Sequence, residues 1–177
     1  PMLMILTLAL GAFYPAVDLT AGEKERGTFE TLLSTPVSKL DIVTGKFLTV
    51  FILAMAAGLA NLVSMAATFF FMVSQAASFA ENKEILQIQV PFHVFPVVLL
   101  SIVPLAFFIS ALMMSVAVLA RSFKEAQNYL TPFFIVITIP AMIAGFPGMQ
   151  LNALSQFVPI ANVILLFKEL MTGTADP

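Results

Sequence analysis

Charged residues are scarce in this sequence: Asp, Glu, Lys and Arg together make up 10% of its 177 residues. Soluble domains typically carry about 25% charged residues, so this composition excludes an ordinary soluble domain. The run from Phe47 to Ala80 contains no charged residue at all. A bilayer core about 30 Å thick needs only ~20 apolar residues in helical form. The sequence therefore predicts an all-α integral membrane protein, a polytopic helical bundle in contact with the lipid bilayer.

Cysteine and tryptophan are absent, and the net charge is only −2. Without cysteine, neither a disulfide framework nor a thiolate metal site can form. Without tryptophan, anchoring at the membrane surface falls to Tyr14, Tyr129, phenylalanine and the basic residues. A net charge this small gives no indication of a nucleic-acid partner.

Signatures of enzymes are missing as well. The one histidine, His93, lies in a predicted external loop, so neither a HExxH zinc motif nor a Ser–His pair can form within a span. Gly45-Lys46 is followed by Phe47 and lacks the first glycine of a Walker A loop. We therefore expect no catalytic residue, metal site or cofactor in this chain. If transport is driven by ATP, a separate ATPase carries the ATP and Mg²⁺.

Four apolar segments predict four membrane spans, at residues 2–17, 47–73, 96–120 and 129–146. Residues 157–167 are too few to cross a bilayer and predict an interfacial or re-entrant helix, within an external hairpin over residues 147–177. No basic region precedes the apolar run, as it would in a cleavable signal peptide. The first span is short and the sequence stops in a turn-like stretch, so we expect a fragment that lacks elements at both ends.

The basic residues predict the orientation of the spans. Residues 18–46 hold four Lys or Arg and residues 121–128 hold two, whereas the 78–95 loop and the tail after residue 146 hold one each. Four spans place these two groups of loops on opposite sides of the membrane. Because loops rich in Lys and Arg stay inside, residues 18–46 and 121–128 are predicted to face the cytoplasm from the cell membrane.

The four predicted spans contain no charged residue. Carriers driven by protons or ions place ionisable groups inside their spans, so the energy for any transport must come from elsewhere. Asn61, in the middle of the second span, is the best candidate for a residue of a transport pathway or of an interface. The alternative for Asn61 and for the Ser and Thr residues of the spans is hydrogen bonding between helices or to their own helix.

The predicted cytoplasmic segment has a pattern of its own. Thr20 and Glu23 have the spacing of a capping box, and so do Ser38 and Asp41. Between them, one apolar stripe and one charged surface predict a short amphipathic helix along the membrane. The stripe consists of Phe29, Leu32 and Leu33, and the charged surface of Glu23, Lys24, Glu25, Arg26 and Glu30. This pattern alone fits either a helix with a solvated charged face or a helix that docks on a soluble partner.

A resemblance to a known family favours docking. Glu25-Arg26-Gly27-Thr28, Thr35-Pro36-Val37 and Gly45-Lys46 resemble the signature between the second and third spans of type 2 ABC exporter permeases. Pro159-Ile160-Ala161-Asn162 resembles the segment before that family's last span. The sequence is most similar to the sodium-efflux permeases of this type. The resemblance covers nearly the whole chain, as spans two to five of an expected six.

The resemblance also implies partners and roles for particular residues. It implies a coupling helix at residues 23–33 that contacts an ABC ATPase subunit, and a homodimer or heterodimer of permeases. The residues expected to dock on the ATPase are Glu23, Glu25, Arg26, Thr28 and Glu30. The residues expected to pack the helix onto the spans are Phe29, Leu32 and Leu33. The alternative is a membrane scaffold that transports nothing and recruits a cytoplasmic protein. The substrate is left open, since an uncharged pathway fits sodium, lipid, drug or peptide.

Overall fold

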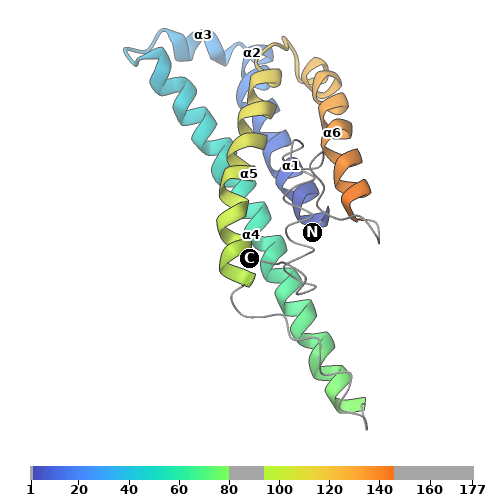
Figure 1. Ribbon diagram of the computed structural model, residues 1–177. Helices are drawn as coiled ribbons and strands as arrows, with labels where there is room; N and C mark the ends of the chain where they lie inside the picture. The colour runs from blue at the N-terminus through green and yellow to red at the C-terminus, as the bar shows by residue number, and fades with distance from the viewer. Residues whose placement is uncertain (1, 80–93, 146–177) are drawn as a thin grey trace.

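The computed structural model describes residues 2–79 and 94–145, and within these ranges it contains helices and no strand (Figure 1). This confirms the predicted all-α helical bundle. The segments are α1 (Met2–Val17), the π-helical turn η1 (Asp18–Gly22), α2 (Glu23–Glu25), α3 (Thr28–Leu33), α4 (Lys39–Phe79), α5 (Val94–Ala117) and α6 (Phe123–Gly145). His93 and the predicted hairpin at 147–177 lie outside the described residues.

Within the described residues, three helices are long and apolar enough to cross a membrane: Met2–Glu25, Lys39–Gln75 and Val98–Ala117. They correspond to the first three predicted spans. The fourth predicted span, residues 129–146, falls almost entirely on α6. Helix α6 is not among the three, and it begins with the charged residues Lys124 and Glu125.

Helix α1 lies at the centre of the bundle and packs against α4, α5 and α6. Its buried side chains follow the spacing of one helix face and are mostly small toward its end: Met4, Ile5, Leu8, Ala9, Ala12 and Ala16. Glycines bring α1 and α4 close together. A Cβ added at Gly11 would lie 2.7 Å from the Cβ of Ala57, and one at Gly58 would lie 2.6 Å from a methyl of Leu8. Small residues at such crossings are typical of membrane helix pairs.

Helix α4 is longer than the predicted span at 47–73. Its 41 residues correspond to about 60 Å at 1.5 Å per residue, twice the thickness of a bilayer core. Figure 1 shows its C-terminal end extending beyond the other helices. Toward this end, Phe70, Phe71 and Met72 are each more than 60% exposed. At its other end, the backbone N–H of Asp41 donates to Ser38 Oγ at 3.1 Å, which confirms the predicted cap.

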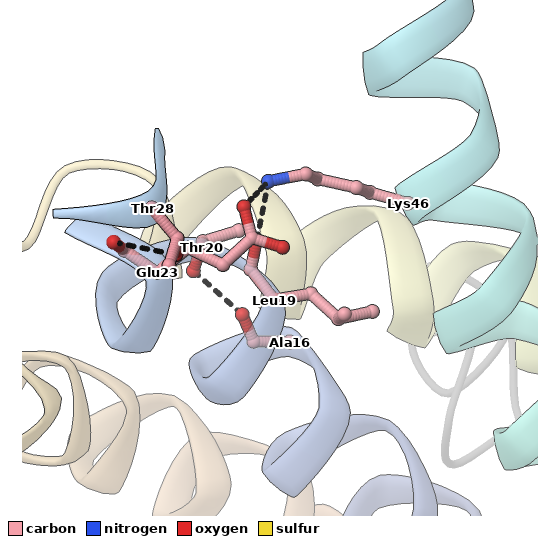
Figure 2. Close-up of polar contacts among 6 residues, drawn as sticks. All are labelled: Ala16, Leu19, Thr20, Glu23, Thr28 and Lys46. Carbon is pink, nitrogen blue, oxygen red and sulfur yellow. Dashed lines mark hydrogen bonds and ion pairs between the residues drawn. The ribbon is translucent and has the colours of Figure 1, made fainter. Parts of the chain in front are cut away.

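The other predicted cap, at Thr20, is wrong. The helical backbone continues from α1 through η1 and α2, and ends only at Glu25. Thr20 is buried, and its hydroxyl donates to the carbonyl of Ala16 at 2.6 Å (Figure 2). Threonine inside a helix often bonds to the carbonyl four residues earlier. The turn that leaves the bundle therefore begins after Glu25, rather than at residue 18.

The segment predicted as one helix at 23–33 is divided in two. Gly27 has a φ of +72°, in the left-handed region, and separates α2 from α3. Glycine adopts this backbone conformation without the clash that a Cβ would cause. Figure 1 shows α3 running across the end of the bundle, from α2 to the start of α4. The same end of the bundle holds the C-terminus of α5 and the N-terminus of α6.

Candidate coupling interface

The charged turn Glu23–Glu25, helix α2, contacts α4 at Lys46, the turn after α5 and the start of α6. Successive residues of a helix point about 100° apart, so three consecutive side chains can reach three different neighbours. Glu23, Lys24 and Glu25 each bind a different neighbouring segment. We call these three residues and Lys46 the polar clamp.

Glu23 binds α4. Its carboxylate forms an ion pair with Lys46 Nζ, and the same ammonium group donates to the carbonyl of Leu19 at 2.7 Å (Figure 2). The two side chains are only 21% and 11% exposed, respectively. Lys46 Nζ also lies 5.3 Å from the ring centroid of Phe29 in α3. The ammonium group thus contacts the carboxylate of Glu23 in α2 and the ring of Phe29 in α3. Through these contacts Lys46 joins α2 and α3 to α4.

Lys24 binds the end of α5. Its Nζ donates to the carbonyl of Val118 and, at 3.1 Å, to the carbonyl of Ala120. These two carbonyls belong to the turn that follows α5, and a cation near the C-terminus of a helix is also stabilised by the helix dipole. An ammonium group at this position therefore stabilises the turn that follows α5.

Glu25 binds the start of α6. Its carboxylate accepts a hydrogen bond from the backbone N–H of Phe123 at 2.6 Å. A second carboxylate, Glu125, accepts from the N–H of Arg121 at 2.8 Å and from the hydroxyl of Tyr129 at 2.6 Å. These two hydrogen bonds, that from Tyr129 first, hold the pKa of Glu125 below its usual value. The N-terminus of α6 is thus capped by one carboxylate of its own and one from α2.

Neither α2 nor α3 contains a buried residue, but the charged side chains of α2 bind three neighbouring segments. Thr28 and Glu30 are exposed, and so is Arg26 just before the helix. Arg26 Nη2 forms an ion pair with Asp18 Oδ1 at 2.6 Å, in which both side chains are at least half exposed. Of the predicted packing residues, Phe29 and Leu32 are half-buried and Leu33 is 46% exposed.

The predicted docking residues thus fall into two groups. The carboxylates of Glu23 and Glu25 bind within the chain, whereas Arg26, Thr28 and Glu30 present exposed side chains around α3. Thr28 contributes to both, because its hydroxyl donates to the carbonyl of Glu23 at 3.2 Å. Glu23 is largely covered by its ion pair, whereas Glu25 is exposed and, like the second group, is accessible to a soluble partner.

Asn61 is half-buried in α4, and its side-chain oxygen is buried without a hydrogen-bond partner in the part of the chain that the structure describes. The hydroxyls of Thr68, Ser101 and Thr138 bond to carbonyls of their own helices. These three hydroxyls therefore follow the predicted alternative of hydrogen bonding to their own helix. Among the described residues, no three His, Cys, Asp or Glu side chains gather as metal ligands would.

Comparison with known proteins identifies the family. The family model of the ABC-2 family transporter proteins matches residues 1–174. The chain belongs to the ABC-2 transporter family. It is 33% identical over 181 aligned residues to the ABC transporter permease protein NatB of Bacillus subtilis (strain 168), with all of this chain and 45% of that protein aligned. The chain thus spans about half the length of this relative. No solved structure matches it.

Membership of the ABC-2 family agrees with the resemblance drawn from the sequence. Together with the long apolar helices, it makes this chain part of a multi-pass cell-membrane protein and a component of a transporter. The residue that sequence reasoning left without a role in this ABC-2 chain is Lys46. One signal could have found it: Lys46 is the last charged residue before the uncharged run that starts at Phe47. A cation at that boundary needs a partner from a neighbouring helix end.

Proposed function

We propose that this chain is the permease part of an ATP-driven ABC exporter, and that α3 docks on a separate ATPase subunit. One observation carries the proposal: the side chains of α2 bind three neighbouring segments, and α3, which follows, exposes Thr28, Glu30 and Leu33. A helix needed only for folding would bury its apolar stripe. An exposed helix on a fastened base is suited to receive a partner. ATP and Mg²⁺ belong to that partner.

In this proposal, the polar clamp transmits the motion of the ATPase. A force on α3 passes through α2 to α4 by the Glu23–Lys46 pair, to α5 by Lys24 and to α6 by Glu25. The ends of three helices then move together. The pathway lies between two permease protomers, alike or different, and alternates between inward- and outward-facing states. Asn61, whose buried oxygen has no partner among the described residues, is proposed to line the pathway or to meet another helix.

The proposed substrate is Na⁺, because the sequence resembles sodium-efflux permeases. The uncharged spans also suit lipid, drug or peptide export. A membrane scaffold that recruits a cytoplasmic protein would use the same exposed α3. Vesicles that contain the full-length permease and its ATPase separate the two functions, because only the exporter produces ATP-dependent flux.

The docking proposal is tested by reversing the charge of Arg26. Arg26→Glu places a carboxylate where the ATPase is proposed to meet a guanidinium. We expect the affinity for the ATPase to fall about tenfold or more, since like charges at an interface cost several kcal/mol. The measurement is co-purification and titration of the ATPase with the full-length permease in detergent.

A matched control separates docking from the loss of an internal ion pair. Asp18→Asn removes the same Arg26–Asp18 pair and leaves the guanidinium on the surface. We expect this variant to bind the ATPase as the unaltered protein does, and both variants to insert into the membrane at equal levels. If Arg26→Glu co-purifies with the ATPase at an unchanged level, α3 is not the docking surface.

A further inference from the structure

A pocket of about 290 Å³ lies between α3 and the bundle. Its walls come from η1, from the helices α2, α3, α4 and α5, and from the turn after α5, and the surface they expose is almost wholly apolar. The apolar lining residues are Phe29, Leu33, Ile42, Val43, Met114 and Val118. The volume is close to the lower limit for sites that hold small ligands. It is large enough for several methylene groups of a chain.

The pocket lies at the depth of lipid head groups. Ile42 and Val43 precede Phe47, the start of the uncharged run, by four to five residues, which is about 6–8 Å along a helix. Head groups extend about 5–8 Å beyond each face of the hydrocarbon core. With the predicted orientation, the pocket therefore opens into the head-group layer of the cytoplasmic leaflet.

The surroundings of the pocket fit a membrane surface better than water. Val37 and Leu40, between α3 and the first turn of α4, are 51% and 76% exposed. Leu33, which lines the pocket, is 46% exposed, and we call it together with Val37 and Leu40, which do not line the pocket, the exposed rim. Apolar side chains near a membrane surface are stabilised by burial at the boundary between head groups and acyl chains.

Three lysines surround the pocket: Lys24, Lys39 and Lys46. Lys46 is neutralised by Glu23. Lys24 binds two neutral carbonyls, which leaves its positive charge uncompensated and one of its three N–H donors available. Lys39 is exposed, and within the described ranges no carboxylate forms an ion pair with it or with Lys24. Two uncompensated cations therefore lie beside an apolar pocket.

We infer that this pocket binds one anionic phospholipid of the cytoplasmic leaflet. The first methylenes of an acyl chain lie beneath α3 against Phe29 and Val43, and the phosphate lies between Lys24 and Lys39. A zwitterionic lipid would bring its own cation near the two lysines, so the site favours lipids with a net negative charge. This inference goes beyond the proposed function, since lipid binding requires no ATPase.

The absence of tryptophan from the chain permits a direct test. Leu33→Trp introduces a single tryptophan at the pocket, and Leu40→Trp introduces one on the exposed rim outside it. The full-length permease, freed of any tryptophan elsewhere, is placed in phosphatidylcholine vesicles that contain either brominated phosphatidylglycerol or brominated phosphatidylcholine. We expect brominated phosphatidylglycerol to quench Leu33→Trp more strongly at equal bromine content, and Leu40→Trp to show no such preference.

Charge reversal tests the head-group contact. In the Leu33→Trp protein, Lys39→Glu is expected to reduce the preference for phosphatidylglycerol at least about fivefold, the effect of one cation at an anionic membrane surface. The matched control is Lys124→Glu, an exposed lysine at the same end of the bundle that does not line the pocket. We expect this control to keep the preference.

Three results would overturn the inference. The first is equal quenching of Leu33→Trp by the two brominated lipids. The second is a preference of the same size for Leu40→Trp, which would reflect general enrichment of anionic lipid. The third is a change in Leu33→Trp fluorescence only when the ATPase is added, which would assign the pocket to the ATPase interface. Because the lipid measurement needs no ATPase, failure of the docking proposal leaves it interpretable.

Discussion

At the scale of single residues, the same sequence pattern had two outcomes. Ser38 and Asp41 form the cap that their spacing predicts, whereas Thr20 and Glu23 do not. The difference lies in the preceding residues. Pro36 stands two residues before Ser38 and disfavours a helix there, so Ser38 is free to begin one. Thr20 follows an unbroken helix, and the carbonyl of Ala16 is within reach of its hydroxyl. A capping pattern is therefore informative only where the chain before it is not helical.

The partners of the charged residues could not be predicted from sequence. The sequence around Glu23 and Glu25 predicts a charged surface, but it does not indicate which residues these carboxylates bind. Their partners, Lys46 and the N–H of Phe123, lie 23 and 98 residues away along the chain. Such contacts depend on how the helix ends are arranged in space, which helical periodicity does not determine.

Lys46 provides the residue-scale prediction. Lys46→Met removes the cation and leaves the mostly buried carboxylate of Glu23 without its partner. We expect the free energy of unfolding to fall by about 2 kcal/mol, the usual cost of a buried polar group left unsatisfied. The measurement is thermal or denaturant unfolding in detergent, followed by helical circular dichroism.

Two controls accompany this variant. Lys124→Met removes an exposed lysine in the first turn of α6 and should change stability little. The double variant Glu23→Gln with Lys46→Met removes the orphaned charge as well, and should regain part of the lost stability. If Lys46→Met is as stable as Lys124→Met, the polar clamp does not hold the helix ends together.

At the scale of helices, apolar runs located the spans better than they located the helix ends. The run starting at Phe47 predicted a span, but α4 begins at Lys39 and ends at Phe79, where the described residues end. Hydropathy reports which residues suit a bilayer, whereas a helix continues until a residue or cap stops it. No Pro interrupts α4, and its two glycines do not end it. The division at Gly27 escaped prediction because glycine is tolerated within helical patterns at modest cost.

Gly27 provides the prediction for the helical elements. A Cβ at Gly27 would meet no atom within 4 Å, so any cost of Gly27→Ala arises from the backbone alone. A left-handed conformation costs a residue with a Cβ about 1 kcal/mol or more. We expect the free energy of unfolding of Gly27→Ala to fall by about this amount. We also expect weaker ATPase binding, because the turn between α2 and α3 would be less populated.

Gly45→Ala is the matched control, because Gly45 also has open space around it but lies inside α4. Alanine is favoured over glycine within a helix, so this variant should gain up to about 1 kcal/mol. The two substitutions are chemically identical and should differ in sign. Equal effects would mean that the turn at Gly27 does not depend on a left-handed backbone.

At the scale of the whole molecule, composition predicted a membrane bundle, and the family comparison agrees. The arrangement of the helices did not follow from composition. The central position of α1 depends on Gly11, Gly58 and its run of small buried residues, which bring the neighbouring helices close. In the sequence, the same residues are indistinguishable from a stretch that faces lipid. The side of the membrane on which α3 lies is a prediction from the distribution of Lys and Arg, and both the docking and the lipid proposals depend on it.

The orientation can be measured because the chain contains no cysteine. Thr28→Cys places a thiol on exposed α3, and Gln75→Cys places one on the exposed far end of α4. Helix α3 leads into the start of α4, and Gln75 lies near the other end of α4, which is about 60 Å long, so the two sites report the two sides of the membrane. We expect a membrane-impermeant maleimide to label Gln75→Cys in intact cells, and Thr28→Cys only after the membrane is opened. The positive-inside rule is the physical reason, since the predicted spans place six Lys and Arg on the α3 side and two on the other. Labelling of Thr28→Cys in intact cells would put α3 beyond the reach of any cytoplasmic ATPase and place the pocket beneath it in the outer leaflet.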